Sequence, residues 1–184
     1  MNAPIDISQV VLKTERLCLR PWTPDDLADF YAYASVDGVG QMAGWLPHKD
    51  IEESRMILQH FIDGKKTFAL EYQGKVIGSL GIERYDEDYF SELAMKKGRE
   101  IGYVLAKDDW GQGLMPEAVQ AVVDYLFHVQ NLDFLMIGYF MYNHQSGRVA
   151  EKCGFKPYRR KMHKTHFGTN EETQMTILYN QPKQ

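Results

Sequence analysis

A glycine turn at residues 110–117, Trp-Gly-Gln-Gly-Leu-Met-Pro-Glu, has the residue types and spacing to bind an anion. Gly111 and Gly113 let the backbone fold tightly and expose its N–H groups. The turn joins a strand expected over residues 100–105 to an amphipathic helix expected over residues 115–131. Because the first turn of a helix has unpaired N–H groups and a positive dipole end, this pattern favours a phosphate site. An ordinary glycine-containing connection is the alternative, and the turn alone leaves both open.

Two common phosphate-binding loops do not match the residues that follow the second glycine. A P-loop requires Gly-Lys-Ser/Thr, whereas Gly113 is followed by Leu114 and Met115. A dinucleotide-binding turn requires a third glycine three residues after the second, and Pro116 occupies that position. The predicted anion site therefore belongs to neither class.

The elements around this turn predict one domain of mixed α/β class. The 184 residues suit a single domain spanning residues 1–184, with loose ends at residues 1–8 and 181–184. The strand–turn–helix–strand unit predicts a parallel crossover, and the hairpins on both sides predict antiparallel neighbours. Further helices are expected over residues 24–35, 51–64 and 145–152. Strands are expected at residues 16–20, 67–72, 76–83, 100–105, 134–141, 158–164 and 173–179.

The overall charge and hydropathy limit the classes of partner. A formal net charge of -4 gives no general attraction to nucleic acid or to an anionic membrane. No apolar run approaches the roughly 20 residues needed to span a bilayer, and residues 1–8 lack the features of a signal peptide. The cysteines show no metal-ligand spacing. We therefore expect a cytoplasmic protein with no metal cofactor and no nucleic-acid or membrane partner.

Four motifs in order along the chain resemble the GNAT superfamily of N-acetyltransferases, in the branch of the ribosomal-protein N-terminal acetyltransferases (RimJ/RimL-like). The glycine turn resembles the acetyl-CoA turn of that branch, Trp-Gly-x-Gly followed by glutamate and alanine, and here includes Glu117 and Ala118. The other three motifs are residues 14–21, 100–103 and 143–155. Met115 departs from the small residue usual at its position. The resemblance implies a central mixed, mostly antiparallel sheet of about seven strands flanked by helices, with the parallel unit at the cofactor site.

The resemblance also implies an activity, the transfer of an acetyl group from acetyl-CoA to a primary amine in a ternary complex. The amine would be a protein N-terminus or a small molecule, and homodimers are common in the family. A non-catalytic CoA-binding sensor or interaction module with the same fold is the alternative. Met115 supports that alternative, as does Ala150, which stands where many relatives have a tyrosine that protonates the leaving thiolate.

The family pattern assigns cofactor contacts to four groups of residues. Strand residues Tyr103, Val104 and Leu105 would hold the pantetheine arm and supply an oxyanion N–H. The turn residues Trp110, Gly111, Gln112, Gly113, Leu114 and Met115 would bind the pyrophosphate. Asn143 would bond the pantetheine or help to position the acceptor, and Ser146 would also contact the cofactor. Arg148 and Lys152 would face the phosphates, with surface acids as alternative partners.

Catalytic and acceptor residues carry a weaker sequence signal. Glu100 is the preferred general base, with Glu83 second, and a structural ion pair is the alternative role for Glu100. Ser146 is the nearest substitute for the missing acid, with Tyr142 or release of the thiolate to solvent as alternatives. A serine at the start of a short helix is more often an N-cap. Residues 42–48 resemble the loop that walls the acceptor cleft. Within it Trp45 is expected to contact substrate, with a core anchor as the alternative, and His48 is expected at the surface. Tyr85 and Glu83 complete the predicted acceptor contacts.

Overall fold

The computed structural model describes residues 1–181, so the predicted loose end at 181–184 lies outside the described residues except for Gln181. Its centre is a sheet with strand order β1-β2-β3-β4-β5-β6-β8-β7. All neighbouring strands are antiparallel except β5 and β6. The strands are β1 (Leu12–Lys13), β2 (Leu17–Pro21), β3 (Thr67–Tyr72), β4 (Lys75–Glu83), β5 (Gly98–Leu105), β6 (Phe134–Phe140), β7 (Lys156–Lys164) and β8 (Asn170–Tyr179).

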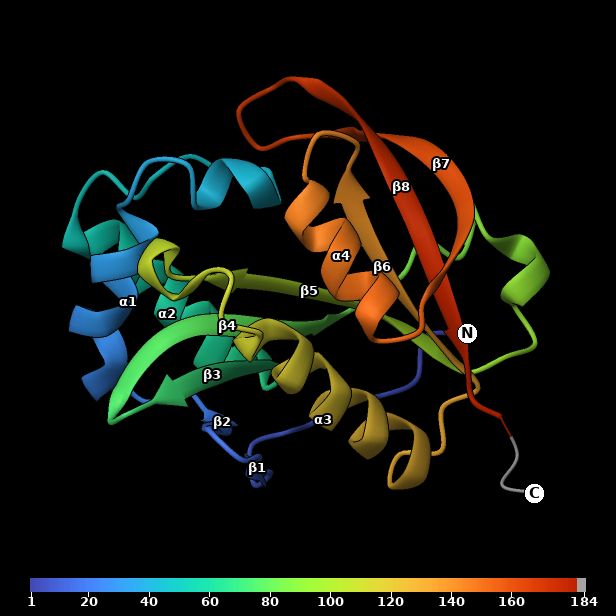
Figure 1. Cartoon of the computed structure of the whole chain (residues 1–184), viewed down its shortest axis with the longest axis horizontal. Coiled ribbons are helices and arrows are strands. Elements are labelled where there is room, and N and C mark those ends of the chain that lie inside the picture. The colour runs from blue at the N-terminus through green and yellow to red at the C-terminus, as the bar shows by residue number, and fades with distance from the viewer. Residues whose placement is uncertain (182–184) are drawn as a thin grey trace.

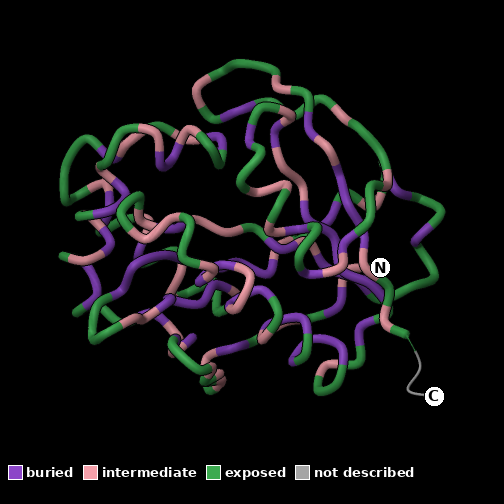
Figure 2. The backbone as a smooth tube through the Cα atoms, viewed as in Figure 1, coloured by how far each residue is buried: buried purple, intermediate pink, exposed green. Residues whose placement is uncertain are grey.

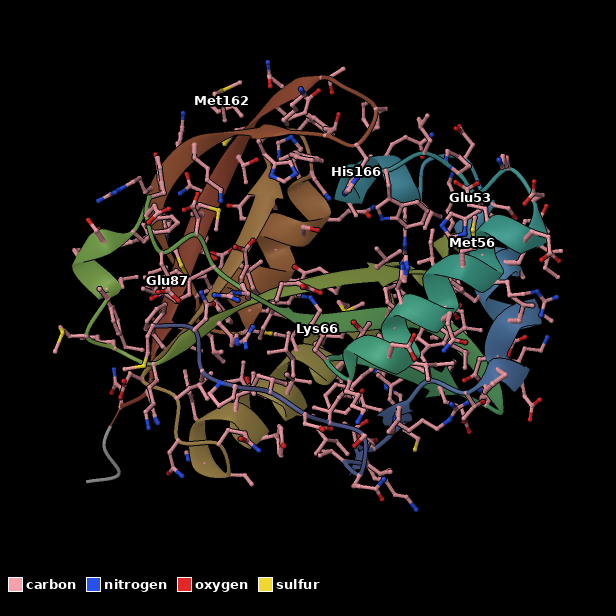
Figure 3. All side chains as sticks on the ribbon, turned by 180° about the vertical axis from the view of Figure 1, so that it is seen from behind. Glu53, Met56, Lys66, Glu87, Met162 and His166 are labelled. Atoms are coloured by element: carbon pink, nitrogen blue, oxygen red, sulfur yellow. The ribbon has the colours of Figure 1, made fainter. Side chains whose placement is uncertain are left out.

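Helices cover both faces of this sheet (Figure 1). They are α1 (Leu27–Ala34), α2 (Ile51–Gly64), α3 (Leu114–His128) and α4 (His144–Lys152). In the rear view of Figure 3, α1 and α2 lie in front of the sheet, on the face opposite α3. The predicted mixed, mostly antiparallel α/β fold is confirmed. Among residues 1–181, no helix combines the length and hydropathy needed to cross a bilayer.

The apolar stripe of α3 fixes that helix on the sheet. Ala118, Val122 and Leu126 are fully buried and belong to the same core cluster as Leu80 and Ile101 on the strands. Figure 2 shows the buried backbone concentrated in the sheet and in this side of α3. Because the glycine turn leads directly into α3, burial of the stripe also fixes the position of the turn.

Strands β5 and β6 are paired over only a short stretch. Their parallel register runs from Gly98 opposite Phe134 to Glu100 opposite Met136. Beyond Glu100, β5 stays with β4 and β6 stays with β8, so the two strands diverge (Figure 1). Each strand then has an edge inside the sheet whose N–H and C=O groups lack a strand partner.

The two ends of the sheet add detail to the predicted fold. To the expected sheet of about seven strands the structure adds the two-residue strand β1, which pairs with β2 and is too short to show a periodic pattern. Residues 1–8 are not loose, since Ala3 and Ile7 are buried in the core. The Arg99 guanidinium donates to the Ala3 carbonyl, and the Ile7 N–H donates to Lys65 over 2.8 Å. The apolar side chains within this polar segment explain why it packs.

Candidate functional site

The glycine turn presents a run of free backbone amides. Gly111 and Gly113 have φ angles of 77° and 78°, in the left-handed region that favours glycine. The Trp110 indole N–H donates to the Leu105 carbonyl over 2.8 Å and fastens the turn to the end of β5. Within residues 1–181, no acceptor is found for the amides of residues 111–115. These N–H groups lie at the positive end of α3, so the donors that the predicted anion site requires are present.

A clamp between Glu117 and Arg16 holds this turn from the far side. The Glu117 carboxylate accepts from the Thr14 hydroxyl over 2.5 Å and from the Arg16 backbone and guanidinium over 2.9 and 2.7 Å. Arg16 also donates to the Gln112 carbonyl over 2.9 Å. Burial raises the pKa of Glu117, but the hydrogen bonds from Thr14 and Arg16 outweigh it and leave the pKa below its ordinary value. The sequence motifs contained both partners, but their contact was not predicted.

The turn, the end of β5 and α4 enclose a cavity of about 440 Å³, which we call the larger cavity. The predicted cofactor residues line it, with the exception of Gln112. The Gln112 side chain donates instead to the Asp108 carbonyl over 3.2 Å, within the same turn. The lining residues from the prediction are Tyr103, Val104, Leu105, Trp110, Gly111, Gly113, Leu114, Met115, Asn143, Ser146, Arg148 and Lys152.

Two cations on α4 face this cavity without an acidic partner. Arg148 and Lys152 are one helical turn apart and exposed. Among residues 1–181, neither forms an ion pair within 4.0 Å, so the alternative pairing with surface acids is not seen. Asp109 also lines the cavity, and burial together with nearby Asp108 raises the pKa of its carboxyl. The two free cations and the free amides make the site suitable for an anion.

Asn143 links the two walls of the site. Its buried side chain accepts from the Ser146 N–H over 3.1 Å, which caps α4. The same side chain donates to the Met42 carbonyl over 3.1 Å, in the turn Gly40–Ala43. Asn143 is thus the N-cap, and the alternative N-cap role of Ser146 is wrong. Ser146 lines the cavity, and its carbonyl accepts a hydrogen bond from the Tyr103 hydroxyl over 3.2 Å.

A second cavity of about 160 Å³, the smaller cavity, adjoins the first. The two share Met42, Ala43, Tyr103 and Ser146 in their walls. The remaining lining residues of the smaller cavity come from β5, β6, β7 and β8, and its ionisable ones are Glu100, Tyr139, Lys161 and His163.

Glu100 is partly buried at the point where β5 and β6 separate. Burial raises the pKa of its carboxyl, while the nearby Lys161 ammonium opposes that rise. Burial, followed by the charges of Lys161 and His166, lowers the pKa of His163. A carboxylate with a raised pKa in a cavity is suited to accept a proton near neutral pH. The predicted position of a base on this strand therefore has a geometric basis.

Three predicted acceptor residues line neither cavity. Tyr85 is buried in the core, with its ring against Phe134 at 5.1 Å. Glu83 lies opposite Glu100 in the sheet, but its carboxylate pairs with Lys66, which Figure 3 labels on the rear face. Aromatic and acidic residue types are common both in clefts and in ordinary packing, which explains these misplacements.

Trp45 is the third of these residues, and it anchors the loop. A Cβ at Gly40 would lie 2.2 Å from the indole, so the ring packs directly on that glycine. The indole also contacts the His48 ring at a centroid distance of 5.1 Å. His48 is buried rather than at the surface, and its Nδ1 lies 2.7 Å from the Ser54 hydroxyl. The core-anchor alternative for Trp45 therefore agrees with the structure.

Several residues of the smaller cavity were not predicted as site residues. Tyr139, Lys161 and Thr173 are the examples. Lys161 and His163 are two residues apart on a strand, so they share a face. That alternation was visible in the sequence, but the face they occupy depends on the pairing of β7 with β8.

Comparison with known proteins identifies the family. A family model described as an acetyltransferase (GNAT) domain matches residues 16–156. The chain belongs to the GNAT acetyltransferase family. This GNAT protein is also 33% identical over 153 residues to YoaA of Bacillus subtilis, an uncharacterized N-acetyltransferase, covering 79% of this chain and 82% of YoaA. The family predicted from four sequence motifs is therefore confirmed, and with it the class of N-acetyltransferases.

Solved GNAT structures share the fold at lower identity. The ribosomal-protein-S5-alanine acetyltransferase of Vibrio fischeri is 21% identical with a TM-score of 0.71, and the match covers 94% of this chain and 97% of that one. The Microcin C7 self-immunity acetyltransferase MccE, solved with acetyl-CoA and AMP, is 15% identical with a TM-score of 0.75, covering 90% and 93%. Both likenesses concern the fold alone.

Proposed function

We propose that this GNAT protein transfers the acetyl group of acetyl-CoA directly to a primary amine in a ternary complex. The observation that carries the proposal is the meeting of the two cavities at Tyr103 and Ser146. One cavity has free amides and cations for an anionic cofactor, and the other has a carboxylate for an amine. The MccE structure, which contains acetyl-CoA, supports this choice of cofactor by its likeness in fold.

In this proposal the larger cavity binds acetyl-CoA in two parts. The pyrophosphate accepts hydrogen bonds from the amides of residues 111–115, with Arg148 and Lys152 as counter-charges. The pantetheine arm carries amide groups, and the diverging edge of β5 at residues 103–105 offers unpaired N–H and C=O groups to them. These contacts would direct the thioester toward the smaller cavity.

The reaction needs a base, an oxyanion donor and a place for the leaving thiolate. Glu100 takes a proton from the incoming ammonium, directly or through water, and the free amine attacks the thioester carbonyl. The C–N bond forms first and gives a tetrahedral oxyanion, which an unpaired backbone N–H of β5 stabilises. The C–S bond then breaks, the nitrogen releases its second proton to solvent, and the thiolate leaves. The Ser146 hydroxyl, which lines both cavities, donates a hydrogen bond to the thiolate. Because serine is a weaker acid than a thiol, we assign the proton that neutralises the thiolate to solvent.

The test combines cofactor binding with turnover. The protein should gain thermal stability with acetyl-CoA and not with ATP or NAD, since its turn lacks the residues that those ligands require. Incubation with acetyl-CoA and a broad panel of amines should release free CoA and an equal amount of acetylated amine. Binding of acetyl-CoA without product from any amine would instead support the non-catalytic CoA-binding module.

A further inference from the structure

The smaller cavity contains opposite charges that come from different strands. Glu100 lies on β5, whereas Lys161 and His163 lie on β7. Lys161 is paired with Thr173 of β8, and Thr173 is paired with Phe140 of β6. Residues directly opposite each other in antiparallel strands share a face, so this row brings the Lys161 side chain to the same cavity as Glu100.

The charges in this cavity are not neutralised by neighbouring side chains. Within residues 1–181, neither Glu100 nor Lys161 forms an ion pair within 4.0 Å. Other cations of β7 do have partners, since Arg159 pairs with Glu92 at 2.9 Å and Arg160 with Glu172 at 3.5 Å. Partly buried charges are costly unless a partner of opposite charge is supplied. A ligand that carries one positive and one negative group would supply a partner of opposite charge for both Glu100 and Lys161.

The volume of the cavity limits the size of that ligand. About 160 Å³ is well below the roughly 300 Å³ at which pockets for drug-sized ligands begin. The β7–β8 hairpin also closes over this side, because the His166 N–H donates to the Gly44 carbonyl over 2.9 Å. Figure 3 shows His166 near the tip of the hairpin, and Gly44 directly follows the turn Gly40–Ala43. The space therefore favours a small acceptor.

We propose that the acceptor is a small amine that also carries an anionic group, a carboxylate or a phosphate. Its ammonium lies at Glu100 and its anionic group at Lys161, with His163 as a second donor. The inference rests on the proposed acetyl transfer and specifies its substrate class. A peptide N-terminus is less complementary, because a neutral amide replaces the carboxylate that a free amino acid presents to Lys161.

The first experiment compares acceptors that differ only in the anionic group. Free amino acids, their carboxamides, the matching aminoalkyl phosphonates and tripeptide amides with the same first residue are tested with acetyl-CoA. We expect kcat/KM for the best acid or phosphonate to exceed that of its carboxamide by roughly tenfold or more. The phosphonate arm decides which anionic group is preferred. Equal or better turnover of carboxamides or tripeptides would overturn the inference while leaving acetyl transfer intact.

Variants of β7 then test the role of Lys161. Lys161→Gln should raise KM for the anionic acceptor roughly 10- to 100-fold and leave the KM of its carboxamide little changed. Lys161→Arg should restore part of the loss. Lys164→Gln is the matched control, because Lys164 is exposed on the same strand and lines neither cavity. An equal loss for acid and carboxamide in Lys161→Gln would show a structural role and refute the assignment.

A binding measurement separates this inference from the proposed function. Calorimetric titration of the same acids and carboxamides into protein saturated with CoA does not depend on turnover. If no amine yields product, acetyl transfer is the claim that fails. Tighter binding of acids than of carboxamides would still support the charge-complementary cavity, and equal binding would overturn it.

Discussion

The larger and the smaller cavity share Tyr103 and Ser146, but they differ in how the chain builds them. The proposed phosphate end of the larger cavity is a continuous turn, residues 110–117, held by the Trp110 indole and by the Arg16–Glu117 clamp. The smaller cavity combines β5, β6, β7 and β8 with the turn Gly40–Ala43. A continuous, clamped turn is suited to a constant cofactor, whereas a cavity made from separate elements can change its ligand through a few side chains.

The largest expected effect is the loss of turnover when the proposed base in the smaller cavity is replaced. Glu100→Gln should lower kcat by roughly 10²- to 10⁴-fold because the amine loses its proton acceptor, while acetyl-CoA affinity stays nearly constant. Steady-state kinetics and calorimetry measure the two quantities. Glu83→Gln is the control, since Glu83 lies opposite Glu100 in the sheet but outside the cavity. A larger kcat loss in Glu83→Gln than in Glu100→Gln would move the base to Glu83.

The second prediction concerns a substitution that changes the larger cavity and leaves the residues of the smaller cavity unchanged. Gly113→Val should weaken acetyl-CoA binding roughly 10- to 100-fold, because valine disfavours the φ of 78° that points the amides of the turn outward. Gly74→Val is the matched control, with a φ of 79° in the turn between β3 and β4 and no atom within 4 Å of the added Cβ. Equal affinities in the two variants, measured by calorimetry, would refute the placement of the phosphates.

A smaller effect is expected from changing a residue that holds the turn in place than from changing a residue of the turn itself. Arg16→Ala removes the clamp on Glu117 and Gln112 and should weaken acetyl-CoA binding roughly three- to tenfold, with kcat at saturation preserved. Arg55→Ala removes an exposed ion pair with Glu52 on α2, far from both cavities, and should leave the affinity unchanged. If both variants bind acetyl-CoA as the parent protein does, the clamp has no role in cofactor binding.

The smallest effect is a shift in pH dependence. A base works in its deprotonated form, and burial raises the pKa of Glu100, so kcat/KM should fall as the pH drops through that raised pKa. Lys161 lowers the Glu100 pKa, so Lys161→Gln should move this acid limb to higher pH. The pH profile of kcat/KM measures the shift, with Lys164→Gln as control. Movement of the limb to lower pH would contradict the proposed pairing of these charges.

Much of the fold was predictable because its signals are local. The strand expected at residues 67–72 is β3, and the helix expected at residues 51–64 is α2, where Asp50 accepts from the Glu53 N–H over 2.8 Å. The glycine turn was predictable for the same reason. Strand β1 was missed because it has only two residues.

The smaller cavity was less predictable because its residues meet only through strand pairing. The pairing of β7 with β8 and of β8 with β6 brings Lys161 to the same cavity as Glu100, and residue type does not encode that pairing. Trp45, in a loop that resembles the family's cleft wall, and Tyr85 were both assigned to the cleft, but both pack in hydrophobic clusters. Hydrophobic burial and ligand contact favour the same aromatic residues, so type alone could not separate the two roles.

The amide group of the Asn143 side chain connects the two walls of the site, the turn Gly40–Ala43 and the start of α4. Its hydrogen bonds to Met42 and to the start of α4 mean that a shift of either wall alters the other. If such a shift changes affinity, reciprocity requires that cofactor and amine alter each other's binding by the same factor. A descendant chain that acquires a new acceptor by changing the turn Gly40–Ala43 would therefore also change its hold on the cofactor.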